Sequence, residues 1–162
     1  MPRHRQYTPL RVYQNNRLVG RLQKEPSGAI GFQYDETWLD RTSAFPVSLS
    51  LPLREDAYRG APVAAVFENL LPDSDALRRR VAEKVGADGY DAYSLLAAIG
   101  RDCVGALQFL PEDAGEPDDQ AALSGEPVDD EAIEKLLKNL VQAPLGLNRD
   151  DDGVFRRANL TP

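Results

Sequence analysis

The chain has little of the chemistry on which most metal sites and many active sites depend. Its 162 residues include one histidine, His4, and one cysteine, Cys103. A structural zinc site takes four nitrogen or sulfur ligands, so the chain alone does not supply one. The only histidine lies close to a terminus, which disfavours a Ser-His-Asp or Cys-His arrangement. We expect Cys103 to be a small core or turn residue, and no internal disulfide can form.

Long apolar runs and phosphate-binding motifs are missing as well. No stretch approaches the ~18 consecutive apolar residues of a membrane helix, and the start, MPRHRQYTPLR, has no apolar segment typical of a signal peptide. We therefore expect a cytoplasmic protein without a membrane partner. Neither G-x-x-x-x-G-K-[ST] nor G-x-G-x-x-G occurs. The run NRDDDG (148–153) resembles the start of an EF-hand loop, but position 12 is Asn159, so we expect no metal site.

Charge is distributed unevenly. Residues 111–131 hold nine acidic residues and no basic one, and the net charge of −7 becomes +2 once these nine are set aside. Residues 1–24 hold six basic residues and no acidic one. Such a basic segment can attract nucleic acid. Outward-facing positions of a strand explain it equally well, and we favour that interpretation because no helix-turn-helix or basic–aromatic pattern accompanies it.

The first part of the chain predicts an antiparallel sheet. Three β-rich runs between residues 10 and 34 are separated by turn signals at Asn15-Asn16 and at Gly28, which predicts a meander. The run FPVSLSLPL (45–53) alternates apolar and polar residues, as a half-buried strand does, and its prolines favour an edge. GALQFL (105–110) predicts a further strand. The meander plus these two strands gives an α+β fold class with packed helices.

Helical periodicity begins after Gly60. Apolar residues recur on one face over 63–70 and again over 77–85, and AYSLLAAIG (92–100) predicts a third helix. Residues 113–128 are an acidic linker by composition. Residues 129–141 then predict an amphipathic helix. The predicted organisation is a subdomain over 1–112, the linker 113–128, the helix 129–141 and a tail over 142–162.

Periodicity leaves three sets of residues as candidates for binding a partner. Two sets lie at corners between predicted elements, where polar side chains also serve as helix caps. The third is the apolar stripe of the last helix. This helix needs a surface to pack against, because the conformational entropy lost on ordering it exceeds the free energy gained by burying its stripe. The candidates are Glu68, Asn69, Asp73 and Arg78, then Arg101 and Asp102, and finally Ile133, Leu136, Leu137 and Leu140.

Several long segments, taken in order, resemble the N-terminal part of the HipA family, the serine/threonine kinase toxins of bacterial toxin–antitoxin modules. They are VYQNNRLVGRL (12–22), GFQYDETWL (31–39), FPVSLSLPL (45–53), FENLLPDS (67–74), LLAAIGRDCVGALQFLPED (95–113), PLG (144–146) and GVFR (153–156). The resemblance implies an α+β subdomain joined to a larger kinase core. In the family, GVFR-like residues lead into a nucleotide loop with a serine and a lysine, whereas here RANLTP (157–162) follows. No catalytic or cofactor-binding residue can therefore be carried over.

The resemblance implies a non-catalytic binding or regulatory subdomain, either HipS-like or a truncated form. Its implied partners are a HipB-like DNA-binding antitoxin, a HipA-like kinase core, or both, with DNA contacted only indirectly. ATP and magnesium would belong to the kinase core and not to this chain. One alternative is a fragment of a complete kinase that phosphorylates a translation factor such as an aminoacyl-tRNA synthetase. A second alternative is a nucleic-acid-binding accessory that uses the basic N-terminus.

Overall fold

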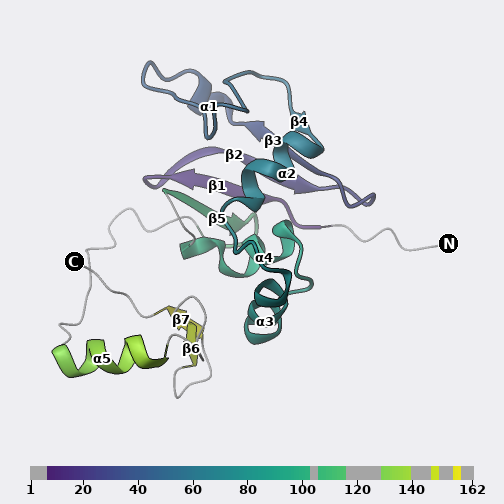
Figure 1. Ribbon diagram of the computed structural model, residues 1–162. Coiled ribbons are helices and arrows are strands. Elements are labelled where there is room, and N and C mark those ends of the chain that lie inside the picture. The colour runs from purple at the N-terminus through teal and green to yellow at the C-terminus, as the bar shows by residue number, and fades with distance from the viewer. Residues whose placement is uncertain (1–6, 103–105, 116–128, 140–146, 150–154, 158–162) are drawn as a thin grey trace. The chain divides into compact units, whose positions relative to one another are not determined.

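The structure is a computed structural model that describes residues 7–102, 106–115, 129–139, 147–149 and 155–157 (Figure 1). The chain divides into two compact units, residues 1–117 and 118–162, which are described separately below. The predicted boundaries at 112 and 128 stay predictions, because the linker residues 116–128 lie outside the described ranges. His4, Cys103 and Leu140 also lie outside them.

Three antiparallel strands open the first unit, as the turn signals predict. They are β1 (Leu10–Gln14), β2 (Arg17–Lys24) and β3 (Ile30–Tyr34). Asn15 and Asn16 between β1 and β2 have φ of 49° and 59°, and Gly28 before β3 has φ of 89°. Asparagine and glycine adopt this left-handed region more readily than other residues, which explains why the chain reverses at these two places.

Two further strands complete a five-stranded antiparallel sheet. They are β4 (Tyr58–Arg59) and β5 (Leu107–Pro111), and the strand order is β4-β3-β2-β1-β5. β5 pairs with β1 although the two strands lie about a hundred residues apart in sequence. The predicted α+β class with an antiparallel sheet is confirmed, and of the two strands predicted beyond the meander, the one at 105–110 corresponds to β5.

The predicted strand over residues 45–53 is wrong. These residues form an irregular loop, and the short strand β4 follows at Tyr58. Of the alternating apolar residues only Leu51 is buried, and Leu49 is 94% exposed. The backbone does not pair with a neighbouring strand, because several of its polar groups bond to buried aromatic side chains instead.

Four α-helices belong to the first unit: α1 (Glu36–Leu39), α2 (Ala61–Glu68), α3 (Asp75–Val85) and α4 (Ala92–Ile99). A 3₁₀ helix, η1 (Gly100–Asp102), follows α4. The side chains of Asp35, Ser74 and Asp91 accept hydrogen bonds from the first turns of α1, α3 and α4. These caps satisfy amide groups that would otherwise lack partners, so the helix starts are encoded locally.

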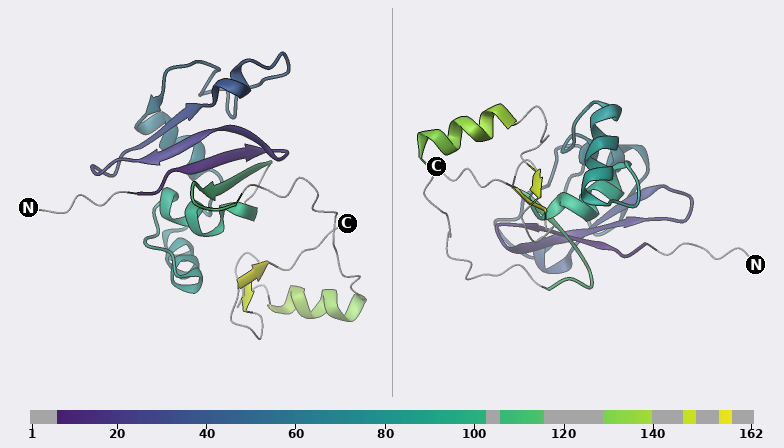
Figure 2. Two further views of the ribbon diagram at one scale, coloured as in Figure 1. Left: turned by 180° about the vertical axis from the view of Figure 1, so that it is seen from behind. Right: turned by 90° about the horizontal axis from the view of Figure 1, so that it is seen from below.

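The core lies between one face of the sheet and the helices. α2, α3 and α4 lie on one side of the sheet (Figure 2). Phe67 from α2 packs between Phe32 of β3 and Phe109 of β5, with ring centroids 5.5 and 5.6 Å apart. Gly20 of β2 and Gly100 leave room for these rings, because a Cβ at Gly20 would lie 2.8 Å from Phe32 and one at Gly100 would lie 2.6 Å from Phe109.

The described residues of the second unit form one helix and a two-stranded sheet. The helix α5 (Asp130–Asn139) falls within the predicted range, and Asp129 caps it by accepting a hydrogen bond from the amide of Ala132 at 2.8 Å. The strands β6 (Leu147–Arg149) and β7 (Phe155–Arg157) pair antiparallel within the segment predicted as a tail. None of the helices in the described ranges combines the length and apolar character needed to span a bilayer.

Candidate partner-binding site

The corner between α2 and α3 contains the first set of predicted residues. Glu68 ends α2, Asn69 is its C-cap, and both side chains are exposed, as is Asp73. Arg78 is half-buried, and its guanidinium donates to the backbone carbonyls of Pro72 at 2.6 Å and Glu68 at 3.4 Å. Arg78 therefore ties α3 to the end of α2, which leaves the exposed Glu68, Asn69 and Asp73 as the accessible members of this set.

The corner between α4 and β5 contains the second set. Arg101 is exposed in η1, and the side chain of Asp102 lies outside the described part of the structure. Gly100, immediately before Arg101, is buried against Phe109. The backbone at Gly100 thus lies against β5, and the exposed Arg101 follows it directly.

The apolar stripe of α5 forms the third set. Ile133 is half-buried, Leu137 is 56% exposed, and the side chains of Leu136 and Leu140 are not described. Among the described residues of the first unit, no ion pair or side-chain hydrogen bond joins the first set to the second. The role of all three sets in binding stays a prediction.

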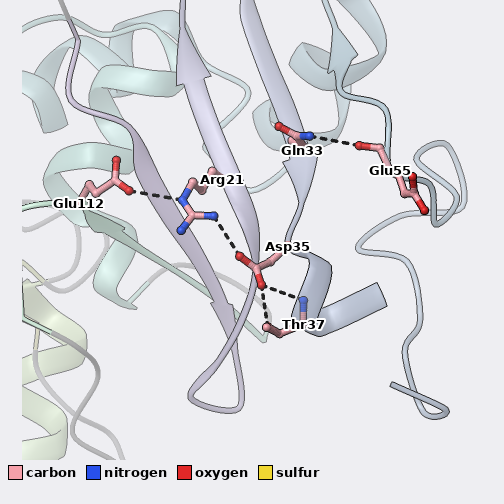
Figure 3. Close-up of polar contacts among 6 residues, drawn as sticks. All are labelled: Arg21, Gln33, Asp35, Thr37, Glu55 and Glu112. Atoms are coloured by element: carbon pink, nitrogen blue, oxygen red, sulfur yellow. Dashed lines mark hydrogen bonds and ion pairs between the residues drawn. The ribbon is translucent and has the colours of Figure 1, made fainter. Parts of the chain in front are cut away.

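A polar network on the other face of the sheet is not foreseen by the sequence patterns. Arg21 of β2 donates to Asp35, which follows β3, at 2.9 Å, and to Glu112, which follows β5, at 3.3 Å (Figure 3). Asp35 also accepts from the amide and the hydroxyl of Thr37 at 3.0 and 2.6 Å. The guanidinium of Arg21 thus connects β2 to Glu112, which lies 91 residues further along the sequence.

The charges of this network reinforce one another. Burial alone would raise the pKa of Asp35, but the hydrogen bonds from Thr37 and Arg21 together with the charge of Arg21 hold that pKa below its usual value. Burial alone would lower the pKa of Arg21, and its bonds and proximity to Asp35 and Glu112 raise it instead. The ionised states of Arg21 and Asp35 are therefore the stable ones at neutral pH.

Other basic residues of the N-terminal segment also have partners inside the unit. Arg11, which faces Arg21 across β1 and β2, donates to the carbonyls of Ala114 and Gly115. Lys24 bonds to Asp91 at 2.9 Å and lies 4.7 Å from the ring centroid of Tyr7. These contacts give Arg11, Arg21 and Lys24 structural roles, and the ion pairs of Arg21 and Lys24 offset part of the positive charge of the segment.

Three buried aromatic side chains form hydrogen bonds with the backbone of the loop between α1 and β4, residues 40–57. The hydroxyl of Tyr34 donates to the carbonyl of Leu51 and accepts from the amide of Val47 at 3.0 Å. The indole of Trp38 donates to the carbonyl of Phe45 at 3.2 Å. The hydroxyl of Tyr58 donates to the carbonyl of Pro52 at 2.6 Å. The loop is irregular but its backbone is fixed at four points.

Further contacts hold the ends of loop 40–57. Arg54 lies over the ring of Tyr58 at 3.5 Å and donates to the carbonyls of Asp56 and Ala57, both at 3.1 Å. Gln33 of β3 donates to the carbonyl of Glu55 at 3.2 Å (Figure 3). Burial raises the pKa of Tyr34 to about 12, so its hydroxyl stays protonated across the neutral range.

The outward side of the same loop is apolar. Phe45, Leu49 and Leu53 are 48%, 94% and 36% exposed, and they make up three of the five large apolar side chains exposed within the described ranges. We refer to them as the exposed apolar set. The alternation over 45–53 could not have revealed them, because Leu51 lies in the same phase as Leu49 and is nevertheless buried.

The described residues include no group of three or more His, Cys, Asp or Glu side chains that could hold a metal ion. What the described surface offers instead is apolar side chains on a fixed loop and polar side chains at two helix corners. These features suit contact with another protein.

Comparison with known proteins identifies relatives for most of the chain. The family model of the HipA N-terminal domain matches residues 10–110. The putative kinase Y4mE of Sinorhizobium fredii is 35% identical over 139 residues, which cover 84% of this chain and 33% of the relative. The serine/threonine-protein kinase toxin HipA of Shewanella oneidensis is 27% identical over 112 residues, which cover 68% of this chain and 25% of the relative.

A solved structure has the same fold. A chain of the complex of HipA, HipB and operator DNA from Shewanella oneidensis MR-1 matches with a TM-score of 0.60 and 24% identity, over 80% of this chain and 29% of that chain. This chain therefore spans a third or less of the length of the relatives it matches.

Proposed function

The chain belongs to the HipA family through its N-terminal domain, and from this premise we propose that it is a non-catalytic binding module of a HipA-like serine/threonine kinase. One observation carries the proposal. The family match covers residues 10–110, whereas two thirds or more of each kinase relative lies outside the matched part. Phosphoryl transfer requires a phosphate cradle, metal carboxylates and a base, and the sequence contains no phosphate-cradle motif. ATP and magnesium then belong to the kinase portion.

We propose two partners for the module, a HipB-like antitoxin and the catalytic portion of a HipA-like kinase. The solved complex of the structural relative, which holds HipA, HipB and operator DNA, supports the first. The relatives named as kinases, in which this domain is part of a much longer chain, support the second. Contact with DNA is then indirect, through the antitoxin. The exposed Glu68, Asn69, Asp73 and Arg101 are the polar residues available to either partner.

Size-exclusion chromatography of purified components tests this proposal. The chain is mixed in turn with a HipB-like antitoxin and with the catalytic portion of a HipA-like kinase, and we expect it to elute earlier with at least one of them. The chain alone, incubated with labelled ATP and a protein substrate, should transfer no phosphate. Separate elution from both partners would refute the binding role, and phosphate transfer by the chain alone would refute the non-catalytic role.

A second function is supported by the length of the alignment with Y4mE. That alignment spans 139 residues and so extends beyond the 10–110 domain. The chain could then be part of a complete kinase that phosphorylates a translation factor such as an aminoacyl-tRNA synthetase. Sequencing the DNA downstream distinguishes the two proposals, because a serine- and lysine-containing nucleotide loop in another reading frame favours the kinase.

A further inference from the structure

Loop 40–57 combines two properties that conflict in an isolated domain. Its backbone is fixed, through the carbonyls of Phe45, Leu51 and Pro52 and the amide of Val47. Its exposed apolar set nevertheless points to solvent, with Leu49 at 94% exposure. Several exposed apolar side chains on one loop with a fixed backbone are candidates for a surface that another protein covers.

The anchoring makes this loop suitable for binding. Trp38, Tyr34 and Tyr58 are buried side chains of the unit itself, so the loop conformation does not depend on a partner. A surface that is ordered beforehand loses little conformational freedom when a partner covers it, and more of the contact energy then appears as affinity.

The relatives indicate what covers the loop. The loop lies inside the matched domain, and in the solved relative the same fold makes up 29% of a longer chain. In Y4mE the aligned part is 33% of the whole. In these relatives the domain is therefore one part of a longer chain. The rest of that chain is a potential partner that always accompanies the domain in them.

Loop 40–57 contains two arginines and three acidic residues, one of them Asp40, so its charges nearly balance, and both arginines lie against aromatic rings. Arg54 is bonded to backbone carbonyls and stacked on Tyr58, and Arg41 lies 6.0 Å from the ring of Trp38. Glu55 and Asp56 lie in the same loop. No excess charge of one sign points to a nucleic acid or a strongly charged peptide, which leaves an apolar protein surface as the matching partner.

We propose that Phe45, Leu49 and Leu53 form the surface with which this domain docks on the catalytic portion of a HipA-like kinase. The inference rests on the proposed function, which supplies the partner, and adds the surface. Because the contact is apolar, its affinity changes little between low and high salt, and binding has a negative heat-capacity change.

The test is calorimetric titration of the full 162-residue chain into the catalytic portion of Y4mE. A rise in the melting temperature of that catalytic portion when ATP is added first shows that it is folded. Leu49→Asp should weaken binding by about tenfold or more, and Leu49→Met should stay within about threefold of the wild type. Tyr90→Asp is the matched control, because Tyr90 is also an exposed large apolar residue, at 45%, but lies outside the loop. It should bind like the wild type.

The outcomes separate this inference from the proposed function. Wild-type binding with undiminished binding by Leu49→Asp overturns the docking surface and leaves the proposed function standing. Absence of any wild-type complex with either partner overturns both. If Leu49→Asp instead disrupts a dimer of the chain in light scattering, or affects only binding to the HipB-like antitoxin, the surface serves another partner and the inference is wrong.

The melting temperature of the Leu49→Asp variant should differ from that of the wild type by no more than about 1 °C, because the Leu49 side chain contacts little.

Discussion

At the scale of single residues, Tyr34 links the sheet to loop 40–57. Its ring packs edge-on against Phe32 at 4.9 Å, and its hydroxyl serves both a carbonyl and an amide of the loop. A tyrosine is needed here because phenylalanine could fill the space but could not satisfy the two backbone groups. Tyr34 therefore belongs to the core and also anchors the loop that carries the candidate binding surface.

Tyr34→Phe should lower the free energy of unfolding by about 1–3 kcal/mol, because a buried carbonyl and an amide lose their partner while the ring stays in place. Urea denaturation followed by circular dichroism measures this change. Tyr90→Phe is the control and should unfold like the wild type, because Tyr90 is exposed. Equal stability of Tyr34→Phe and the wild type would show that water replaces the hydroxyl at no cost.

Asp35 gives stability a defined dependence on pH. Its folded-state pKa lies below the ordinary value of 3.8, so the unfolded chain binds the proton more readily than the folded chain does. The contribution is present above about pH 4 and disappears as the pH falls through the folded-state pKa. Asp91 shifts in the same direction, since bonds from Ser94 and Lys24 outweigh the opposing effect of its burial.

Asp35→Asn should therefore reduce stability at pH 7 and make the loss of stability between pH 5 and pH 2 shallower than in the wild type. Denaturant titrations at a series of pH values provide the comparison. A residual slope should remain from Asp91 and should diminish further when Asp91→Asn is added. An Asp35→Asn curve parallel to that of the wild type would exclude Asp35 as the source.

At the scale of elements, β2 depends on the small size of Gly20. A Cβ at this position would lie 2.3 Å from the backbone carbonyl oxygen of Gln33 and 2.8 Å from the ring of Phe32. The carbonyl belongs to the neighbouring strand β3 and cannot move without distorting the ladder. The close approach, not a special backbone angle, is what requires glycine here.

Gly20→Ala should destabilise the domain by about 1–3 kcal/mol, since overpacking forces the strand or the Phe32 ring to shift. Chemical denaturation measures the effect. Gly115→Ala is the matched control, because a Cβ at Gly115 has open space around it and should be tolerated. Comparable stability of the two variants would mean that β2 and β3 separate more easily than their pairing suggests.

The turn residues and helix caps made most elements predictable. Asn15-Asn16 and Gly28 mark turns that the structure reproduces, and the helix expected from the periodicity over 77–85 is α3, which Ser74 caps and the left-handed Gly86 ends. Residues 45–53 alternate as a strand does but form none, because their backbone groups bond to the side chains of Tyr34, Trp38 and Tyr58. β4 could not be foreseen, since two residues are too short to show a period.

The side-chain networks were less predictable than the elements. Arg21 and Glu112 meet because β5 pairs with β1, and that pairing depends on contacts between distant parts of the chain. Arg78 was predicted as a binding residue, but local sequence could not show that its guanidinium would bond to two carbonyls of the preceding corner. Spacing indicates which face a residue occupies and says little about its partners beyond the same element.

At the scale of the whole molecule, the two units differ in how much apolar surface they bury. The first contains all 22 of the core residues identified in the described ranges, with Phe67 and Phe109 among the fully buried. In α5 of the second unit, Leu137 is exposed and Ile133 is half-buried. Stability measured by unfolding should therefore report mainly on the first unit.

Leu137→Asp should leave the melting temperature of the isolated chain nearly unchanged, because the side chain is 56% exposed. If the stripe of α5 contributes to binding a partner, the same change should abolish or strongly weaken the complex detected by size exclusion. Differential scanning calorimetry of the variant provides the first measurement. A large fall in melting temperature would instead give the stripe an internal packing role.

The pairing of β5 with β1 has a consequence for the order of events during synthesis. The paired residues lie 93 to 101 positions apart, and at roughly 5–20 residues per second a ribosome needs about 5–20 s to deliver β5 after β1. Throughout that interval one edge of β1 has no intramolecular strand to pair with and can associate with other nascent chains. The meander can form early, but the domain is protected from aggregation only once its last strand has emerged.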